Sequence, residues 1–349
     1  MMTESEPSFP WLVAAPFLDS VDSPWISDFA STDRHRFEKV PHGGGDSNWH
    51  TKAAQRTGLA EWRQFSRTSS ALIDAAVEQG GGAITVFPQL AASAAWKKRL
   101  RRLDVPLVAW FFNTTFGRDA RSILARPALR GVDRFVVHST NEIEAYAHHL
   151  KLPTDLFAFA FVQYGGTIQT DAENTDEPFV FATGSGFRDY ATFFEAMSKL
   201  DVSAKVVAGP RVLAGLTPPP NVEILEGIDR HGIHRLVRQA TVNVLPMNNE
   251  GLTAGLITMA EAFRHGRSLV VSDRGGIDDY VQHDENALLV PVGDSNAMAE
   301  SIRAVLDDRE LRDRLNNGAL RAGELRHTDE AAGRRLVEVL DAVLEDRSC

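Results

Sequence analysis

Short apolar runs alternate with amphipathic stretches along most of this chain, and that alternation limits the folds open to it. Runs that are apolar throughout are typical of strands buried on both faces, and the periodicity between them favours helices. In the first half we expect strands at 11–18, 83–88, 106–112, 133–138 and 156–162, with helices at 58–79, 90–103 and 142–152. Strands and helices in this order predict a parallel sheet covered on both sides.

The alternation stops at 171–178, where eight residues carry no core-forming side chain, and then it restarts. In the second half we expect strands at 179–183, 205–208, 222–225, 242–246, 268–272 and 287–292, helices at 189–200, 230–239 and 254–265, and a charged helical tail at 296–345. A chain of 349 residues with 43% hydrophobic content can build two cored domains. We therefore expect two similar α/β domains, with ligands at the carboxyl ends of the strands and in the cleft between the domains.

Charge and cysteine content restrict the partners and the compartment. The formal net charge is −10, and the net negative charge lies entirely beyond residue 170, which argues against a nucleic-acid partner. Cys349 is the single cysteine, so the sequence offers neither a disulfide nor a thiolate metal site. The start of the chain is polar and no apolar stretch is long enough for a membrane span. We expect a cytoplasmic protein.

The segment 243–279 is the richest in chemistry-bearing residues. A buried strand leads through a polar turn into a helix that opens at Thr253-Ala254-Gly255. Small residues at a helix start leave backbone N–H groups free, so a diphosphate fits there. Glu261 falls on the same face as Thr253 and Thr258, where its carboxylate could accept hydrogen bonds from a ribose diol. The plainer interpretation is that Thr253 caps the helix and Glu261 is a solvated surface residue.

The order of motifs from Gly251 onward resembles that of a known enzyme family. A glycine-rich helix start is followed by Glu261-Ala262, an apolar strand ending in Ser272-Asp273, the Gly275-Gly276 turn and a strand of the form Asn-Ala-Leu-Leu-Val-Pro at 286–291. This order resembles the family-4 retaining glycosyltransferases of the GT-B fold. The segments 179–196 and 133–165 are similar to further parts of that family, whereas 1–130 agree only in their pattern.

The resemblance implies a GT-B architecture, with two facing Rossmann-like domains and a cleft between them. It implies an acceptor-binding domain at 1–168, a linker at 169–178, a nucleotide-sugar-binding domain at 179–330 and a C-terminal helix at 331–349 that packs back on the first domain. It also implies transfer of a sugar from a nucleoside diphosphate to a glycan, lipid-linked or small-molecule acceptor, with retention. No cofactor or metal is expected.

Several site residues follow from the resemblance, with departures from the family pattern. Glu261 matches the second glutamate of the family's Glu-x7-Glu motif, whereas Thr253 stands in place of the first and Glu250 is a substitute from the turn. Ser185 and Asp189 stand where the family has an arginine and a lysine, which leaves Arg188 as the local cation. The expected donor-binding residues are Gly184, Ser185, Arg188, Gly209, Gly227, Ile228, Thr253, Ala254, Gly255, Leu256 and Glu261. The expected catalytic residues are Arg188, Glu250, Glu261 and Asn113.

Expectations for the acceptor side are less specific. Asn113 stands where many relatives have a histidine, and an amide cannot serve as a titrating base. The glycine-rich loop with His42, Gly44 and Trp49 either contacts the acceptor or is a plain connecting loop. The basic run 96–102 either rests on anionic lipid at the inner face of the membrane or is a solvated helix face.

Two other functions compete with transfer. A nucleotide-sugar epimerase of the same architecture is disfavoured. Its acid–base chemistry needs carboxylates and a histidine near the sugar, and this sequence has no glutamate at 253 and no histidine at 113. A catalytically degenerate subunit that only binds a nucleotide or glycan is favoured by the missing cations at 185 and 189. Assays for donor binding and for turnover separate these alternatives.

Overall fold

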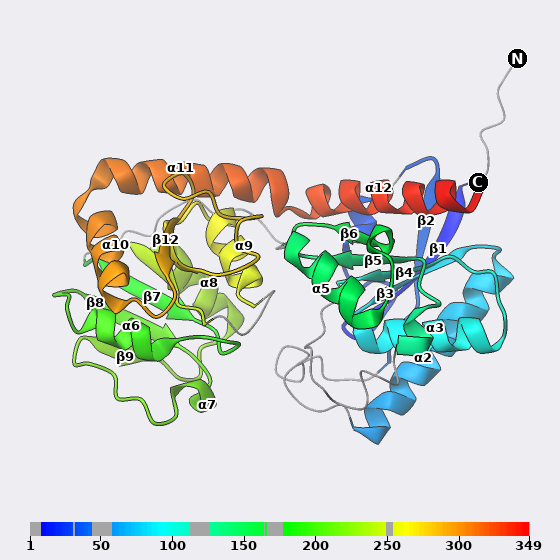
Figure 1. The fold of residues 1–349 in the computed structure, drawn as a ribbon, viewed down its shortest axis with the longest axis horizontal. Helices are drawn as coiled ribbons and strands as arrows, with labels where there is room; N and C mark the ends of the chain where they lie inside the picture. Colours follow the sequence, from blue (N-terminus) through cyan, green and yellow to red (C-terminus); the bar gives the residue numbers. More distant parts are fainter. Residues whose placement is uncertain are drawn as a thin grey trace, which may run out of the picture. The chain divides into compact units, whose positions relative to one another are not determined.

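The computed structural model describes residues 8–30, 32–43, 58–111, 126–163, 165, 177–248 and 254–348. The chain divides into two compact units, the first formed by residues 1–160 and 332–349 and the second by residues 161–331. Each unit contains one six-stranded parallel sheet with helices on both faces (Figure 1). The prediction of an α/β fold with two parallel sheets is therefore confirmed.

Unit 1 has the strand order β2-β1-β3-β4-β5-β6. Its strands are β1 (Phe9–Ala14), β2 (His35–Lys39), β3 (Gly82–Val86), β4 (Leu107–Trp110), β5 (Arg134–Val137) and β6 (Phe157–Phe159). Its helices are α2 (Leu59–Glu78), α3 (Pro88–Leu100), α5 (Thr140–Leu150) and most of α12 (Asp329–Ser348). The short 3-10 helices η1 (Ile26–Phe29) and η2 (Thr154–Leu156) lie in its loops.

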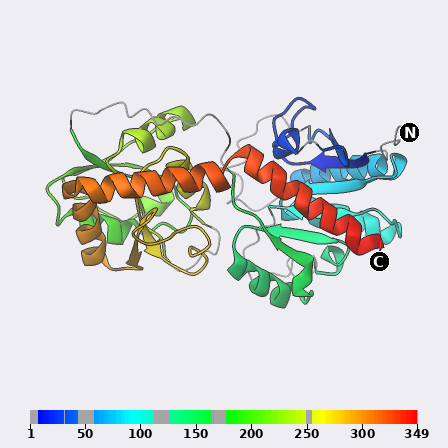
Figure 2. The ribbon, with the colours of Figure 1, turned by 90° about the horizontal axis from the view of Figure 1, so that it is seen from above.

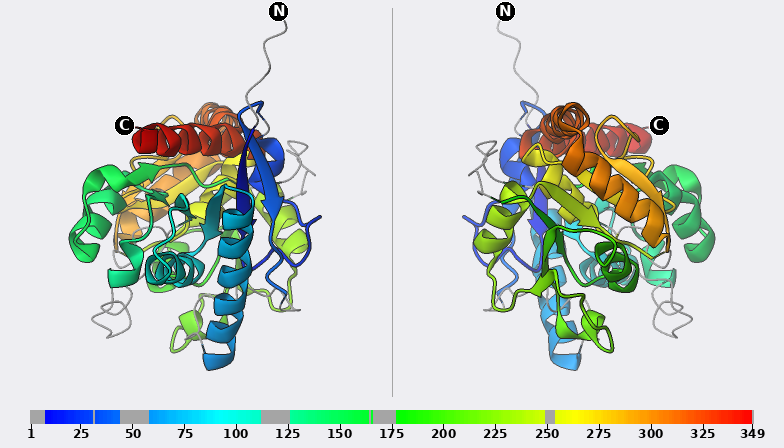
Figure 3. Two further views of the ribbon diagram at one scale, coloured as in Figure 1. Left: turned by 90° about the vertical axis from the view of Figure 1, so that its right-hand side faces the viewer. Right: turned by 90° about the vertical axis from the view of Figure 1, so that its left-hand side faces the viewer.

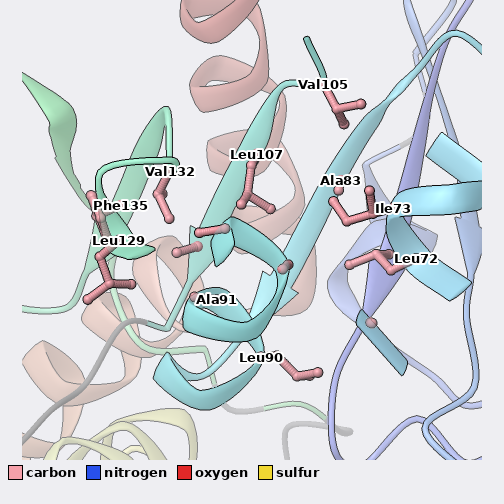
Figure 4. Packing of buried hydrophobic residues seen from close by; sticks show 14 of the residues in the cluster. Leu72, Ile73, Ala83, Leu90, Ala91, Val105, Leu107, Leu129, Val132 and Phe135 are labelled. Atoms are coloured by element: carbon pink, nitrogen blue, oxygen red, sulfur yellow. The ribbon is translucent and has the colours of Figure 1, made fainter. Parts of the chain in front are cut away.

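The two faces of the unit 1 sheet are covered by different parts of the chain. Helices α2, α3 and α5 cover one face, with Leu72, Leu90 and Leu107 in their shared core (Figure 4). Helix α12 covers the other face and packs against Trp11 and Trp110 (Figures 1 and 2). Successive strand residues alternate between these two cores, so both faces are apolar.

Unit 2 has the strand order β12-β11-β10-β7-β8-β9. Its strands are β7 (Phe179–Thr183), β8 (Ser203–Val207), β9 (Val222–Ile224), β10 (Val242–Leu245), β11 (Leu269–Asp273) and β12 (Leu288–Pro291). Its helices are α6 (Tyr190–Met197), α7 (Pro210–Leu213), α8 (Arg230–Gln239), α9 (Leu256–Arg264), α10 (Ser295–Asp307) and α11 (Arg309–Arg326). Helices α6 and α10 pack together (Figure 3), and α9 packs against α11.

Both sheets reverse their strand order beside their first strand. In unit 1 the reversal lies between β1 and β3, and in unit 2 it lies between β7 and β10. At such a point the loops from the two neighbouring strands diverge, which leaves an open crevice beyond their carboxyl ends. The fold therefore identifies the carboxyl edge at β7 and β10, and that at β1 and β3, as the places to look for ligands.

The structure differs from the expected elements at several places. Strand β2 was not predicted, because it is an edge strand whose residues are mostly half-buried or exposed and form no apolar run. The charged tail, which was expected to be helical over 296–345, forms the three helices α10, α11 and α12. The units divide at 160/161, whereas the expected linker was 169–178, most of which lies outside the described residues.

Candidate functional site

The loop after β7 and the loop after β10 are joined at the strand reversal of unit 2. The Asp189 N–H donates to Pro246 O at 3.0 Å, and the Asn248 N–H donates to Phe187 O at 3.1 Å. Arg188 and Met247 form an isolated antiparallel bridge between the same loops. This backbone pairing fixes residues 184–189 at the carboxyl edge of the sheet, next to the start of α9.

Gly184 is the residue that allows the Arg188 side chain to fold under this loop. Its φ is +101°, and a Cβ at this position would lie 2.5 Å from Arg188 Nη2. Any other residue would combine backbone strain with a steric clash against the guanidinium. Gly184 and Arg188, both expected at the donor site, therefore lie side by side.

Arg188 is a buried cation with neutral hydrogen-bond partners. Its side chain is 8% exposed and donates to Thr183 O at 3.0 Å, Gly186 O at 2.8 Å and Thr258 Oγ1 at 3.2 Å. Burial lowers the pKa of Arg188 to about 10, with Tyr190 opposing the shift and Arg274 adding to it. The guanidinium is thus still charged at neutral pH. Arg188 is therefore not a surface residue, and it forms no ion pair with any described residue.

The start of α9 differs from the other long helices of unit 2. Helices α6, α8, α10 and α11 each begin at an aspartate whose side chain accepts a backbone N–H, namely Asp189, Asp229, Asp294 and Asp308. Helix α9 begins at Gly255, with φ +88°, no side-chain cap and no acidic residue in its first turn. Its first N–H groups therefore lack the carboxylate that its neighbours use. Asp189, where the family has a lysine, serves as the cap of α6.

Glu261 lies on α9, three residues after Thr258 and so on the same face of the helix. The residue is only 5% exposed, so the alternative of a solvated surface carboxylate is wrong. His234 of α8 approaches it, with Nε2 at 3.6 Å from Glu261 Oε1. Burial, together with the nearby Arg230 and His231, lowers the pKa of His234 to about 4, so the imidazole is neutral at pH 7. Arg188, Thr258, Glu261 and His234 thus form a row of polar side chains across α9.

The segments expected to contact the nucleobase lie at the carboxyl ends of β8 and β9. The Gly209 N–H donates to Ser185 Oγ at 2.8 Å, which ties the loop after β7 to the loop after β8. Gly227 has φ +68° and, with Ile228, precedes the start of α8. Leu256, the first residue of α9, is buried, and Ala254 O accepts a hydrogen bond from Arg274 Nη2. Ser185, Gly209 and Arg188 are brought to one edge of the sheet.

In unit 1 the structure places only one of the expected acceptor residues. His42 is buried, with Nδ1 at 2.9 Å from Thr68 Oγ1 and its ring beside Phe65 of α2. It therefore anchors its loop to α2. The remaining expected residues, Gly44, Trp49 and Asn113, together with Glu250 and Thr253 of the donor site, lie outside the described residues.

Sequence reasoning did not single out the aromatic residues at the carboxyl edge of unit 1. Phe17 follows β1, Phe87 follows β3 and Phe111 follows β4. Their ring centroids are 6.2 Å apart for the first pair and 5.2 Å for the second, and Phe111 lies 4.4 Å from His138, which follows β5. Phe87 has φ +75° and ψ 151°, a conformation normally restricted to glycine. We call these three phenylalanines the aromatic edge of unit 1.

Arg274 also went unnoticed in the sequence. It follows β11 at the same edge of unit 2, and its side chain is 4% exposed. A single arginine after a strand carries no periodic signal, so only its position at the carboxyl edge could have drawn attention to it.

Residues 213–321 match the family model for glycosyl transferases group 1. This group 1 segment runs from the end of α7 into α11 and contains α8 and α9, with Glu261 and Arg274. A D-inositol 3-phosphate glycosyltransferase from Nocardioides sp. is 29% identical over 168 residues, which are 46% of this chain and 34% of that relative. The chain thus spans about a third of the length of the curated relative that it matches.

Solved structures show the same fold at low sequence identity. A glycosyltransferase from Rickettsia africae has a TM-score of 0.71 at 12% identity, covering 97% of this chain and 99% of that one. Anabaena HepE in complex with UDP-glucose has a TM-score of 0.68 at 13% identity, covering 95% and 99%. Sucrose-phosphate synthase from Thermosynechococcus elongatus has a TM-score of 0.67 at 15% identity, covering 97% and 100%. The α/β fold is that of these GT-B enzymes.

The described residues contain neither a candidate membrane span nor a candidate metal cluster. No helix there is both long enough and apolar enough to cross a membrane. Within the same residues, no three histidine, cysteine, aspartate or glutamate side chains are grouped as they would be to hold a metal ion.

Proposed function

We propose that this protein is a glycosyltransferase that moves a sugar from a nucleoside diphosphate sugar to an acceptor, with retention and without a metal ion. The observation that carries the proposal is Arg188, a buried charge with neutral partners, beside the uncapped start of α9 at the strand reversal of unit 2. Buried charges are normally paired, so this edge is suited to a ligand that brings negative charge. The group 1 segment includes α9 itself.

In this proposal, the donor lies along the carboxyl edge of unit 2. The diphosphate sits against the N–H groups at Gly255 and Leu256, which the partial positive charge of the helix start favours. The buried carboxylate of Glu261 holds the ribose diol, and the neutral imidazole of His234 limits where that carboxylate can turn. The base lies against the backbone at Gly209 and at Gly227-Ile228.

The proposed reaction is a substitution at the anomeric carbon of the donor sugar. The acceptor hydroxyl oxygen forms the new bond on the same face from which the diphosphate leaves. The anomeric C–O bond to the diphosphate breaks, and a donor phosphate oxygen takes the acceptor proton. The protein then contributes mainly by positioning the substrates and stabilising the charge of the leaving group. Arg188 and the helix start supply positive charge from the chain itself.

We propose that unit 1 binds the acceptor, which is a glycan, a lipid-linked sugar or a small molecule. The half-buried rings of the aromatic edge suit the apolar face of a sugar ring.

We also propose peripheral contact of α3 with an anionic membrane. Trp96 and Leu100 are 48% and 64% exposed, one turn apart, although Lys98 and Arg101 are paired with Asp133 and Asp74. Co-sedimentation with phosphatidylglycerol vesicles tests this contact. Wild-type protein should sediment with the vesicles and the Trp96→Ser/Leu100→Ser variant should not. Equal sedimentation of both would show that α3 does not contact the membrane.

The proposed function is tested by a binding screen followed by a turnover assay. A nucleoside diphosphate that binds only the folded protein raises its melting temperature, so a panel of diphosphates identifies the base. Glu261→Gln should weaken nucleotide binding about 100-fold, because the buried carboxylate would no longer accept both ribose hydroxyls. Glu195→Gln, which changes an exposed carboxylate on α6, is the matched control. Wild-type affinity in Glu261→Gln would refute the donor site.

Turnover separates transfer from its rivals. Sugar transfer that is unchanged by EDTA, with an anomeric configuration matching the donor, supports the full proposal. A new nucleotide sugar formed without acceptor would indicate an epimerase, and tight nucleotide binding with neither transfer nor hydrolysis would indicate a degenerate subunit.

A further inference from the structure

Phenylalanine adopts an unusual backbone conformation at three positions in this protein. Among the described residues, those other than glycine with positive φ are Phe87, Arg102, Phe111, Lys151, Phe187 and Asp284. Arg102 and Lys151 follow helices and Asp284 precedes β12, whereas each phenylalanine follows the carboxyl end of a strand, namely β3, β4 or β7. The carboxyl edges of both sheets therefore carry phenylalanine where the backbone favours glycine.

Phe187, in the loop after β7, is the phenylalanine of this group that lies in unit 2. Its φ is +55°, in the left-handed region, where a Cβ is crowded by the neighbouring backbone. A phenylalanine there costs folding free energy that a glycine would not. The same loop contains Gly184 and Gly186, so the sequence uses glycine at nearby positions and yet keeps an aromatic side chain at 187. The ring of Phe187 therefore needs a role that offsets this cost.

Packing inside unit 2 does not explain the ring of Phe187. Phe181, Phe193 and Phe194 are buried and belong to the regular elements β7 and α6. Phe187 is only half-buried, so part of its surface is open to solvent at the carboxyl edge of the sheet. Strained residues gather at ligand sites, and an aromatic ring offers a large apolar contact surface. A partly open ring on a strained backbone is therefore suited to contact a ligand.

The pairing of the loops places Phe187 on the side that faces β10. Phe187 O accepts the Asn248 N–H at 3.1 Å, which joins this residue to the loop after β10. On the opposite side, Ser185 Oγ accepts the Gly209 N–H at 2.8 Å, which joins Ser185 to the loop after β8. The base of the proposed donor lies beside Gly209. Phe187 therefore lies away from the base, towards the end of the donor that carries the sugar.

We propose that Phe187 is a donor-binding residue whose ring packs against the apolar face of the transferred sugar. The C–H groups on one face of a pyranose ring form a flat apolar surface that matches an aromatic ring. This inference rests on the proposed function. It adds a contact to the sugar to a site that otherwise holds the base, the ribose and the diphosphate.

The test uses the full-length chain and compares ligands with and without the sugar. The variants are Phe187→Asn, Phe187→Tyr and the matched control Lys151→Asn. Lys151 also has φ +55° but lies exposed at the end of α5 in unit 1. The probes, titrated by calorimetry, are the nucleoside diphosphate selected by the screen and its glucosyl, galactosyl and mannosyl esters. Urea unfolding without ligand measures the stability of each variant.

We expect Phe187→Asn to bind the nucleoside diphosphate as the wild type does. It should bind the ester that the wild type prefers about 3- to 10-fold more weakly, because one ring contact is lost. Phe187→Tyr keeps the ring and should show wild-type affinity for both ligands. The urea midpoint should rise in Phe187→Asn and in Lys151→Asn, because asparagine tolerates the left-handed conformation better. Lys151→Asn should leave every affinity unchanged.

The outcomes separate this inference from the proposed function. If Phe187→Asn binds both the diphosphate and the ester as the wild type does, Phe187 has no role and the function stands. A lower urea midpoint with an equal loss of affinity for both ligands would show that Phe187 only supports the loop, which overturns the inference.

Two further outcomes concern the wild type and the folding of the variant. If the wild type binds neither the diphosphate nor an ester, the proposed function fails and the inference fails with it. If it binds the diphosphate but none of the esters, the site excludes a sugar and both are again overturned. If Phe187→Asn does not fold, Phe187→Leu replaces it, since leucine is apolar but has no ring. Wild-type affinity of Phe187→Leu for the ester would overturn the inference.

Discussion

The two units share an architecture, a six-stranded parallel sheet that reverses beside its first strand, yet the chemistry at their carboxyl edges is opposite. Both sheets reverse beside their first strand, so each has an open edge formed by the loops of two diverging strands. In unit 2 that edge carries Gly184 at positive φ and the buried charge of Arg188. In unit 1 it carries Phe17, Phe87 and Phe111, two of them at positive φ.

The difference shows how one architecture can provide two kinds of binding edge. A glycine that lets the backbone and a guanidinium approach closely is useful where a compact anion must be held. Strained aromatic residues at strand ends are useful where a flat apolar surface must be held in one position. The topology therefore determines where a ligand lies, and the residues directly after the strands determine which ligand it is.

The largest expected effect concerns the polar edge. Gly184→Ala places a Cβ 2.5 Å from Arg188 Nη2 at φ +101°, so the guanidinium must move. We expect nucleotide affinity to fall about 100-fold or more, which corresponds to about 3 kcal/mol. Isothermal titration measures it, with Gly186→Ala as the matched control because a Cβ there meets no atom within 4 Å. Equal affinities for the two variants would show that the position of Arg188 does not matter for binding.

The second expected effect concerns the charge of His138, which lies at the carboxyl edge of unit 1. Burial lowers the pKa of His138 to about 4 from 6.5, although a hydrogen bond to Ala160 O opposes the shift, so at neutral pH the ring beside Phe111 is uncharged. Between those values the unfolded chain binds more protons than the folded one, so the free energy of unfolding falls as the pH drops from about 7 to 4. The loss attributable to this group is on the order of 3 kcal/mol.

His138→Gln should therefore flatten the dependence of unfolding free energy on pH in that window. Urea unfolding at pH 7 and pH 5 measures the slope, and His148→Gln, at an exposed histidine on α5, is the control. An unchanged slope in His138→Gln would mean that burial does not lower the pKa of His138 in the folded protein.

The smallest expected effect concerns the aromatic edge itself. Phe17→Leu removes one ring from the row and should raise the acceptor KM about 3- to 10-fold, leaving the donor KM unchanged, because a ring contact is worth roughly 0.5–1.5 kcal/mol. Phe9→Leu, at the opposite end of β1, is the matched control. Steady-state kinetics with each substrate varied in turn checks it, and a change confined to the donor KM would reverse the assignment of the two edges.

Much of the fold was predictable because its strands are buried on both faces. The segments 179–183 and 242–246 are apolar at all but one position each, and they form β7 and β10 within one residue of those limits. Strand β2 was missed for the opposite reason, since an edge strand has no need of a continuous apolar run. Sequence patterns report burial, and elements at the margin of a sheet are only partly buried.

The parts of the site that depend on backbone conformation were predictable from the sequence. The parts that depend on the contacts of single side chains were not. The small residues at 254–255 indicated an open helix start, and α9 begins there with an uncapped Gly255. Arg188 was expected as a local cation, but its hydrogen bonds to backbone carbonyls depend on the pairing of two loops. Arg274 lies 86 residues further along the sequence from Arg188, and only the order of the strands brings the two to the same edge.

Helix α12 has a consequence for how the chain is made. It covers the face of the unit 1 sheet that contains Trp11 and Trp110, yet a ribosome synthesises it only after the whole of unit 2. Until then the nascent first half displays a broad apolar surface, which is a target for chaperones and for self-association. Unit 2 can fold before α12 has been synthesised. We therefore expect unit 1, although it begins the chain, to reach its native state after unit 2.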